Sequence, residues 1–332
     1  MKRFAMLLTA ITLAVALFPP AVPGNSLAGT PIRFAYQDRV GSALCIVAVE
    51  KGLFRQQGLN VVSSRFTSGT ACAEALYSGS ADIGEMGDAT AVIAVSQSDR
   101  FRIIASHGGG ENRHRIVVRK DSPIRKPADL VGRKLAVKKG TSTYGGFLVY
   151  CVKNGIDIKK VKVLDLAPEN MPEALSAGSI DAYVASEPTP SLAETRGARA
   201  MGTLGGLGNT YPLLILARKK LLAERPGEVR KFLAALKQAE TFVRKHPREA
   251  ADLIGRVGGL SVRDAENSIK LHDFRLNLDG NTVGSLEKIA DFLKEQAKIR
   301  TVPDFSRVTD TSFLQSVRAR RQNQALRFMP RR

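Results

Sequence analysis

Tryptophan is absent from this chain of 332 residues, and cysteine and histidine are rare, with three and four copies. Without tryptophan, an aromatic platform for a flat ligand ring would have to use tyrosine or phenylalanine. The histidines are scattered and no two cysteines have the CxxC spacing, so the sequence gives no support to a zinc site. We therefore expect no metal ion and no other cofactor.

Long apolar runs are also scarce. The one clear run, Phe4–Phe18, follows Lys2 and Arg3 and is too short to span a bilayer. Small residues at 26–28 then offer a site for signal peptidase. We therefore predict a signal peptide over residues 1–28 and export of the mature protein to the periplasm. Since no other segment is apolar enough to cross a membrane, we expect the mature protein to be soluble.

The three cysteines are Cys45, Cys72 and Cys151. An exported chain permits disulfides. Cys45 and Cys72 fall near the starts of two neighbouring predicted helices and could pair, which would leave Cys151 free and buried. The alternative is three unpaired buried cysteines. Thr30 stands where a lipoprotein signal ending at residues 27–29 would require cysteine, so we expect no lipid anchor.

Acidic residues are too few to balance the basic ones, since 31 against 50 gives a net charge of +19. Such a surplus attracts anions and disfavours cations as partners. Part of it lies in residues 318–332, which contain six arginines and no acidic residue and are typical of a solvated tail. Nucleic acid is a competing anionic partner. We do not expect it to bind, because the chain has no helix-turn-helix, zinc-finger or aromatic RNA-binding signature.

One short pattern occurs twice, and the second copy follows the first by 99 positions. Each copy has an apolar helix that ends at a glycine, a short strand with an aspartate, and a polar turn that opens another helix. The copies comprise Glu74-Ala75-Leu76, Gly79, Asp82, Thr90 and Ala94, and Glu173-Ala174-Leu175, Gly178, Asp181, Thr189 and Ala193. One unit in each half predicts two similar lobes with a ligand cleft between them. Chance similarity of two amphipathic segments is the alternative.

Repeated alternation of strand and helix patterns indicates an α/β fold, and the mature chain is long enough for two lobes with real cores. We predict that lobe 1 begins with residues 29–114 and that lobe 2 comprises residues 115–213. Residues 214–332 would return to lobe 1 as a mainly helical segment and end in the basic tail. The chain would cross between lobes near residues 113–116 and 210–214.

Three polar loops precede predicted helices, namely Ser68-Gly69-Thr70, Asp88-Ala89-Thr90 and Thr141-Ser142-Thr143. A helix start leaves backbone N–H groups unpaired and carries partial positive charge, so these loops could bind an anion. In an open α/β sheet, such loops lie at the carboxyl ends of strands, where ligands bind. Plain N-capping is the alternative for each loop, but three loops together favour an anion site.

Other candidates lie beside these loops. Glu187, in the turn of the second repeat, could hold an amine or another donor group of a ligand, or could cap its own helix. Tyr36 and Gln37, at the end of the first predicted strand, could pack on and hydrogen-bond a ligand, although Tyr36 could equally belong to the core. His107 and Tyr211 fall close to the predicted crossings.

The order of these motifs resembles the substrate-binding proteins of ABC importers, especially the group that takes up sulfonates, taurine, nitrate or thiamine-pyrimidine precursors. The motifs that carry the resemblance are Lys51-Gly52-Leu53-Phe54, Gln57-Gly58-Leu59-Asn60-Val61, Ser68-Gly69-Thr70, Asp82-Ile83-Gly84, Asp129-Leu130-Val131-Gly132-Arg133-Lys134, Lys139-Gly140-Thr141-Ser142 and Asp310-Thr311-Ser312-Phe313-Leu314. The resemblance covers essentially the whole mature chain. It implies a two-lobed type II periplasmic-binding-protein architecture, in which each lobe is a mixed sheet flanked by helices.

The resemblance also implies that the lobes close on a ligand and that their surfaces dock on a membrane permease. By motif, the cleft would be lined by Tyr36, Gln37, Ser68, Gly69, Thr70, Asp88, Thr141, Ser142 and Glu187. The sequence departs from the family at Asp38-Arg39, and Arg39 could contact an anion or face solvent. The cysteine-rich signature of pyrimidine-making relatives is missing, which argues against a self-consuming enzyme.

We therefore expect a monomeric carrier that binds a small anionic ligand, most readily an aliphatic sulfonate or taurine, without catalysis. Nitrate and a thiamine pyrimidine precursor are alternative ligands. A cleft enzyme, such as a dehydratase or precursor synthase, would need a convergent base and acid, for which Asp88 and Glu187 are candidates. A ligand-sensing subunit would have the same sequence features.

Overall fold

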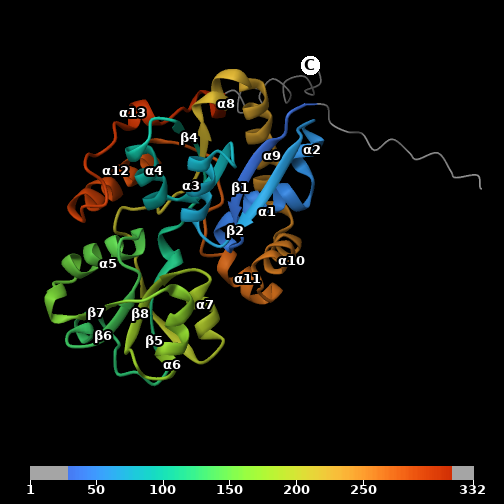
Figure 1. Ribbon diagram of the computed structural model, residues 1–332. Coiled ribbons are helices and arrows are strands. Elements are labelled where there is room, and N and C mark those ends of the chain that lie inside the picture. Colours follow the sequence, from blue (N-terminus) through green and yellow to red (C-terminus); the bar gives the residue numbers. More distant parts are fainter. Residues whose placement is uncertain (1–28, 316–332) are drawn as a thin grey trace, which may run out of the picture.

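The computed structural model describes residues 29–315, which form two α/β lobes joined by several crossings of the chain (Figure 1). The predicted signal peptide over residues 1–28 and the basic tail over residues 318–332 lie outside the described residues. No helix within residues 29–315 is both long and apolar enough to cross a membrane.

The first lobe is built on a five-stranded sheet with the order β2-β1-β3-β10-β4. Its strands are β1 (Ile32–Gln37), β2 (Val61–Phe66), β3 (Ile83–Gly87), β4 (Phe101–Gly108) and β10 (Leu213–Arg218). Strands β1, β2 and β3 are parallel, whereas β10 is antiparallel to both of its neighbours. The sheet therefore needs a strand that comes more than 100 residues after the other four.

The second lobe repeats this arrangement in a sheet with the order β7-β6-β8-β5-β9. Its strands are β5 (His114–Arg119), β6 (Lys134–Val137), β7 (Lys162–Asp165), β8 (Ala182–Ser186) and β9 (Ala198–Thr203). Strand β5 is antiparallel to β8 and β9, just as β10 is antiparallel to its neighbours in the first sheet. The structure thus confirms an α/β fold with two mixed sheets.

The sequence repeat corresponds to equivalent elements of the two sheets. Gly79 follows α3 (Gly69–Ser78) with φ +79°, and Gly178 follows α6 (Met171–Ser176) with φ +72°; both values suit glycine. Asp82 and Asp181 precede the central strands β3 and β8. Each aspartate accepts a backbone N–H from the neighbouring strand, at 3.0 Å in the first lobe and 2.8 Å in the second.

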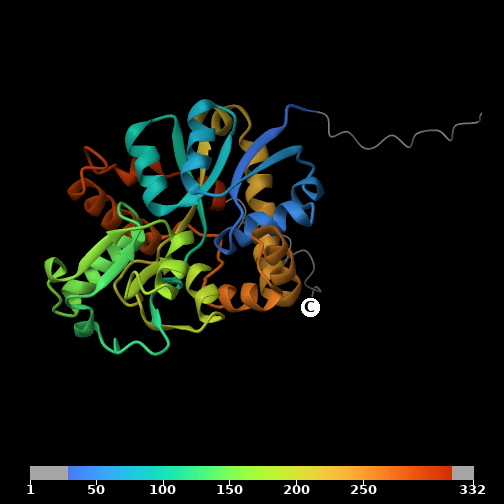
Figure 2. The same ribbon diagram turned by 60° about the horizontal axis from the view of Figure 1, so that its bottom comes forward.

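Helices flank both sheets (Figures 1 and 2). Besides α3, the first lobe has α1 (Ala43–Glu50), α2 (Leu53–Gln56), α4 (Asp88–Gln97), α8 (Lys219–Glu224), α9 (Pro226–Lys245), α10 (Pro247–Gly258), α11 (Val262–Ile269), α12 (Gly280–Glu295) and α13 (Phe305–Val308). Besides α6, the second lobe has α5 (Ser142–Lys153) and α7 (Thr189–Glu194). Short 3₁₀ turns are η1 (Val40–Ser42), η2 (Glu111–Arg113), η3 (Pro127–Leu130), η4 (Ile158–Lys160) and η5 (Pro168–Asn170).

Helix α9 illustrates why the late part of the chain returns to the first lobe. It begins at Pro226, where the missing N–H of proline costs nothing, and it buries an apolar stripe at helical spacing. Phe232 in this stripe stacks on Phe54 with ring centroids 4.6 Å apart and meets Phe34 of β1 edge-on at 5.0 Å. A helix from the second half of the chain therefore completes the core beneath the first strand.

All three cysteines are free and buried, so the disulfide predicted between Cys45 and Cys72 is absent from the structure. Cys45 lies on α1 and Cys72 on α3, where both fill the apolar core of the first lobe. Cys151 lies in the core of the second lobe, where burial raises its pKa to about 11. The three thiols behave as small apolar side chains, which is the alternative that the sequence left open.

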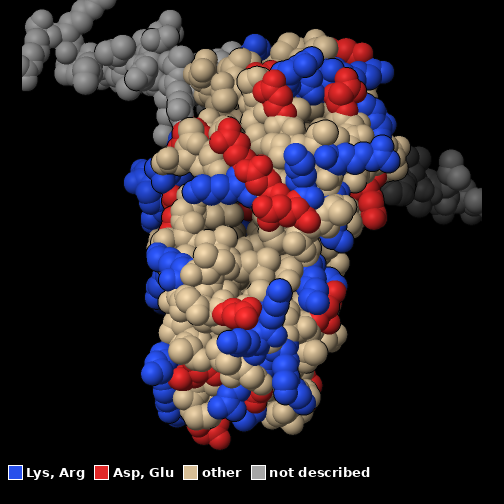
Figure 3. Space-filling model, turned by 90° about the vertical axis from the view of Figure 1, so that its left-hand side faces the viewer, with Lys and Arg blue, Asp and Glu red and all other residues tan. Residues whose placement is uncertain are grey.

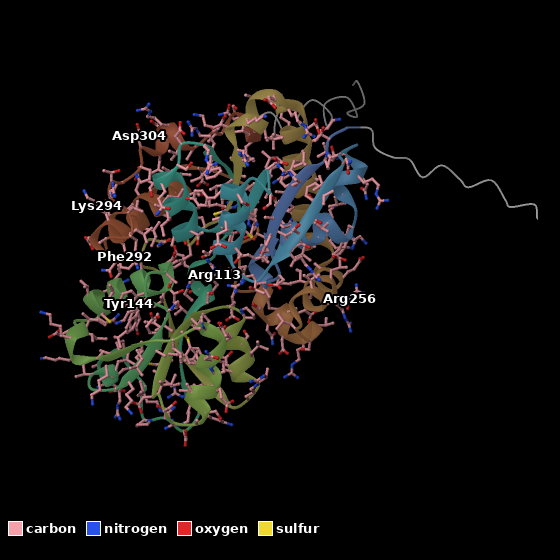
Figure 4. All side chains as sticks on the ribbon, viewed as in Figure 1. Arg113, Tyr144, Arg256, Phe292, Lys294 and Asp304 are labelled. Atoms are coloured by element: carbon pink, nitrogen blue, oxygen red, sulfur yellow. The ribbon has the colours of Figure 1, made fainter. Side chains whose placement is uncertain are left out.

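The chain passes from the first sheet to the second through residues 109–113 and returns through residues 204–212. Helices of the late segment also touch the second lobe, with α12 against α5 and α11 against α7. These contacts lie on opposite sides of the space between the lobes (Figures 1 and 2). Phe292 of α12 meets Tyr144 of α5 with ring centroids 6.1 Å apart (Figure 4).

Candidate functional site

A cavity of about 300 Å³ lies between the lobes and is lined by residues of both. It collects nine of the ten residues predicted for the site, namely Gln37, Ser68, Gly69, Thr70, Asp88, Thr141, Ser142, Thr143 and Glu187. They come from the carboxyl end of β1 and from the starts of α3, α4, α5 and α7. Arg39, which the sequence left between an anion contact and solvent, also lines the cavity.

Tyr36 is the exception, because its side chain belongs to the core of the first lobe and does not line the cavity. It alternates with Gln37 along β1, so the two side chains point to opposite faces of the sheet. The Tyr36 ring stacks on Phe34 at 5.5 Å, and burial raises its pKa to about 12. The prediction that Tyr36 packs on a ligand is therefore wrong, and its core alternative holds.

The hydroxyl groups at the helix starts are mostly occupied within the protein. Ser68 accepts the N–H of Ala71 at 3.2 Å and so caps α3. Thr141 accepts the N–H of Tyr144 at 3.3 Å, caps α5 and donates its own hydroxyl proton to a backbone carbonyl at 2.7 Å. What these starts still offer a ligand is the partial positive charge of the helix ends beside the cavity.

One hydrogen bond crosses the cavity from lobe to lobe, because the Ser142 hydroxyl of α5 donates to Asp88 Oδ1 of α4. Asp88 is 2% exposed, and its Oδ2 has no hydrogen-bond partner within residues 29–315. Burial raises the pKa of Asp88, and the hydrogen bond from Ser142 and the charge of Arg113 only partly oppose that effect. The lobes thus meet at a carboxylate that is destabilised by desolvation.

Glu187 is held from behind by an ion pair. Arg115 lies 2.7 Å from Glu187 Oε1 and also contacts Glu194 at 3.0 Å and the Ser191 hydroxyl at 2.9 Å. Glu187 is 2% exposed, and its second oxygen finds no partner in the described part of the chain. One carboxylate oxygen is therefore committed to Arg115, and the other is buried beside the cavity without a partner among residues 29–315.

Arg113 is the main feature that the sequence reasoning missed as a site residue. Its guanidinium is buried at the centre of the molecule between the lobes (Figure 4), lines the cavity and donates to the Tyr211 carbonyl at 3.0 Å. Its Nε has no acceptor among the described residues. Burial lowers the pKa of Arg113 to about 10, and Asp88 counteracts this, so the side chain stays cationic at neutral pH. A buried cation with an unused donor is a strong anion-binding group.

Two histidines line the cavity beside Arg113. His114 Nδ1 lies 2.8 Å from the Thr143 hydroxyl, and His272 Nδ1 lies 2.8 Å from the Ser268 carbonyl. In both rings Nε2 has no partner among residues 29–315. Burial lowers the pKa of His272 to about 3 and that of His114 well below its usual value, and the charge of Arg113 adds to both shifts. Both rings are therefore neutral at physiological pH.

Neither of the other two candidates near the crossings lines the cavity. His107 is fully buried in β4 and lies 3.3 Å from Glu85 of β3. Tyr211 has a positive φ of 47° in the returning crossing, and its ring lies 4.1 Å from that of His114. Tyr211 thus supports the wall through His114, and its carbonyl orients Arg113.

The cavity contains charged groups, but no cysteine thiol that could act as a nucleophile. None of the three cysteines lines it, and burial raises the pKa of each thiol. No group of three or more metal-ligating side chains occurs within residues 29–315. Its polar groups are those of a binding site, with the buried cation Arg113, the further basic residues Arg39 and Lys138, several helix starts and the carboxylates of Asp88 and Glu187.

The outer surface carries the charge that the composition predicts. Lysine and arginine gather over both lobes on the face shown in Figure 3, with acidic residues interspersed between them. Many of the acids form surface ion pairs, such as Lys138 with Asp165 at 3.2 Å and Arg275 with Asp273 at 2.7 Å. Lys138 is also part of the cavity lining, so one of these ion pairs lies at the edge of the site.

A sequence profile of the family described as NMT1/THI5 like matches residues 40–250. A Brucella abortus chain named as a binding protein is 26% identical over 322 residues, which cover 92% of this chain and 96% of the relative. The taurine-binding periplasmic protein of Escherichia coli is 26% identical over 300 residues, covering 86% of this chain and 92% of the relative.

Solved structures with the same fold include the periplasmic aliphatic sulphonate binding protein SsuA of Escherichia coli. It has a TM-score of 0.77 and 22% identity, over 85% of this chain and 92% of that one. The desulfurization enzyme DszB also shares the fold, with a TM-score of 0.70 and 17% identity, over 87% of this chain and 99% of that one. At these identities the structures confirm the predicted architecture, which both a binding protein and an enzyme can have.

Proposed function

The chain belongs to the NMT1/THI5-like family, and from this premise we propose that it is a periplasmic solute-binding protein for a small aliphatic sulfonate. The sulfonate would bind in the cavity between the lobes, and the lobes would close on it by a shift of population. The relatives named for taurine and aliphatic sulfonates support this ligand class.

The observation that carries the proposal is Arg113, a buried guanidinium with an Nε that has no acceptor within residues 29–315, at the wall of the interlobe cavity. A sulfonate keeps its negative charge throughout the pH range in which proteins are stable. It would therefore offset the buried cation permanently and accept hydrogen bonds from the guanidinium and from the N–H groups of the helix starts. Nitrate would fill less of a 300 Å³ cavity, and a pyrimidine would lack the charge.

The proposal includes a role without catalysis. DszB is an enzyme with this fold, and one solved form of it, with a cysteine replaced by serine, holds biphenyl-2-sulfinic acid. In this chain the thiols lie in the cores, and burial raises their pKa values, so none is placed to attack a ligand. The bound ligand would leave unchanged.

We further propose that the mature chain begins after Ala28, acts as a monomer in the periplasm and delivers its ligand to an ABC import permease. Export agrees with the charged start and apolar run of residues 2–18. The permease would contact the exposed surfaces of the lobes. The cavity would stay reserved for the ligand.

A binding screen tests the proposed ligand class. Residues 29–332 would be purified, stripped of ligand by unfolding and refolding, and titrated with ethanesulfonate, taurine, nitrate, acetate and a pyrimidine. Ligand at 100 times its dissociation constant should stabilise the protein by about 2.7 kcal/mol in a thermal-shift assay. We expect this for the sulfonates. Stabilisation by nitrate or the pyrimidine alone would overturn the ligand assignment, and turnover of the sulfonate would overturn the carrier role.

A further inference from the structure

A buried carboxylate lies directly behind one wall of the cavity. Glu85, in the middle of the central strand β3, is fully buried and does not line the cavity. It accepts the Gln37 backbone N–H at 3.0 Å, the Gln37 side-chain amide at 3.2 Å and the Ser42 hydroxyl at 2.8 Å. His107 Nε2 lies 3.3 Å from its other oxygen. Gln37 and Ser42 both line the cavity.

An ionised carboxylate only accepts hydrogen bonds, so it decides which way its partners turn. Gln37 must direct its NH₂ group at Glu85, because its carbonyl oxygen would meet a negative charge there. Ser42 must direct its only hydroxyl proton the same way. The Gln37 carbonyl oxygen is then turned away from Glu85 and is the fixed acceptor left for the cavity. The Gln37 NH₂ group keeps a second hydrogen, and Ser42 is fully buried, so its hydroxyl serves to hold Glu85 in place.

Glu85 keeps its charge despite complete burial. Desolvation alone would raise its pKa, but the hydrogen bonds from His107, Gln37 and Ser42 outweigh it, and the net shift is downward. The carboxylate is therefore ionised at neutral pH. Its partners, in turn, are held in one orientation by bonds that are stronger than neutral ones.

We propose that Glu85 is a positioning residue that fixes the side-chain amide of Gln37 with its carbonyl oxygen as a hydrogen-bond acceptor at the cavity, so that the site favours sulfonates carrying a hydrogen-bond donor. The proposal rests on the function proposed above, and deepens it, because Arg113 would take the sulfonate whereas the Gln37 carbonyl oxygen would take the donor end. A ligand that brings no donor would leave this acceptor without a hydrogen bond, at a cost in affinity.

The first test needs no ligand. The side-chain amide signals of Gln37, identified by their loss in Gln37→Met, would be followed by ¹⁵N NMR in the unliganded protein. Slow exchange and a shifted position are expected in the wild type and should be lost in Glu85→Gln. Glu240→Gln is the matched control, since Glu240 of α9 also accepts a backbone N–H, at 2.8 Å, but lies outside the cavity lining. An unchanged Gln37 amide in Glu85→Gln would overturn the proposal whether or not sulfonates bind.

The second test separates positioning from a merely structural role. Taurine and ethanesulfonate share the sulfonate, and only taurine carries an ammonium donor, so calorimetry with both gives a selectivity ratio. Losing a hydrogen bond to a charged donor should lower that ratio by about fivefold or more in Glu85→Gln. Ethanesulfonate affinity should change far less, and Glu240→Gln should keep the wild-type ratio.

The outcomes are distinct. A parallel loss of affinity for both ligands in a folded Glu85→Gln would mean that Glu85 only supports the fold, and would overturn the proposal. If Glu85→Gln does not fold, Gln37→Met gives the same readout, because it removes the fixed acceptor and leaves the carboxylate in place; an unchanged ratio would then overturn the proposal. A wild type that binds neither sulfonate would instead refute the proposed function, and the NMR test would still decide the role of Glu85.

Discussion

At the residue scale, the site depends on polar atoms that the fold buries and leaves unpaired. The predicted hydroxyls are largely used inside the protein, since Ser68 and Thr141 cap their helices and Ser142 binds Asp88. The free donor is Arg113, whose Nε has no acceptor in the described part of the chain. A ligand is therefore expected to gain most from the group that has no other partner.

Replacement of Arg113 by methionine tests this directly. The change keeps much of the side-chain volume and removes the cation, so ethanesulfonate affinity should fall by about 10- to 100-fold, the value of a hydrogen bond to a charged group. Isothermal calorimetry would measure it. Arg256→Met is the matched control, because Arg256 of α10 has a side chain 67% exposed and forms an ion pair with Asp252 across one turn (Figure 4). Equal ethanesulfonate affinities in the two variants would show that Arg113 does not contribute to binding.

The lowered pKa of His272 predicts how the stability of the protein depends on pH. In the folded protein its pKa is about 3, whereas an unfolded histidine takes up its proton near pH 6.5. Between these values the unfolded state binds the extra proton, so this group makes the protein less stable as the pH falls, by about 1.4 kcal/mol for each pH unit. Above pH 6.5, His272 is neutral in both states and does not make the free energy of unfolding depend on pH.

The His272→Gln variant removes this titration and keeps a hydrogen-bonding side chain. Urea unfolding at pH 7, 5.5 and 4.5 should show a shallower loss of stability for the variant than for the wild type. His114, which also has a strongly lowered pKa, will still contribute to the slope in both proteins. Parallel curves would show that His272 is not kept neutral in the folded state.

The sequence could place the loops but not Arg113 and His114, and the reason is strand direction. Ligand loops are expected at the carboxyl ends of parallel strands, which correctly located residues 68–70, 88 and 141–143. Strand β5 is antiparallel, and its first residue, His114, pairs with Ser186 at the end of β8. The beginning of β5 therefore lies at the cavity edge, and no periodicity in the sequence reveals this orientation.

At the element scale, the contact between α5 and α12 couples the lobes. A Cβ added at Gly145 of α5 would lie 3.0 Å from the Phe292 ring of α12, closer than such contacts normally are. Gly145 does not line the cavity, so this contact can influence a ligand only through the packing of one lobe on the other. Glycine here allows the two helices to approach.

Gly145→Ala should therefore weaken binding without touching the ligand. We expect about 1 kcal/mol, or roughly fivefold in the dissociation constant of ethanesulfonate, because the ring or the lobe must move. Gly284→Ala on α12 is the control, since a Cβ there meets nothing within 4 Å among the described residues. The control should bind normally and gain about 0.5–1 kcal/mol in stability from the better helix former. Normal binding by Gly145→Ala would show that this contact does not govern closure.

At the scale of the whole molecule, the duplicated sequence pattern was sufficient to predict two matching lobes. Gly79 and Gly178 end equivalent helices, and Asp82 and Asp181 accept equivalent hydrogen bonds from a neighbouring strand. The repeated residues therefore have the same structural roles in both lobes. The disulfide could not be predicted in the same way. Spacing brought Cys45 and Cys72 to neighbouring helices but could not say whether their sulfur atoms would meet or fill the core.

Closure of the two lobes should be visible in solution. Small-angle X-ray scattering of the mature protein should give a smaller radius of gyration with saturating ethanesulfonate than without it. Ser142→Ala removes the hydrogen bond from lobe to lobe and should enlarge the unliganded protein, whereas Ser179→Ala, which changes an exposed serine of the second lobe, should not. A radius that ligand leaves unchanged would mean that the lobes are already fixed.

The late antiparallel strand β10 also imposes an order on biogenesis. The sheet of the second lobe is contiguous, from His114 to Thr203, whereas the sheet that begins at Ile32 stays incomplete until Leu213–Arg218 has been made. The lobe that emerges first is thus the last to complete its sheet, and it exposes the edge of β3 until β10 has been made. A nascent chain that stalls before residue 213 would contain one foldable lobe and one open sheet, which is the form most in need of a chaperone.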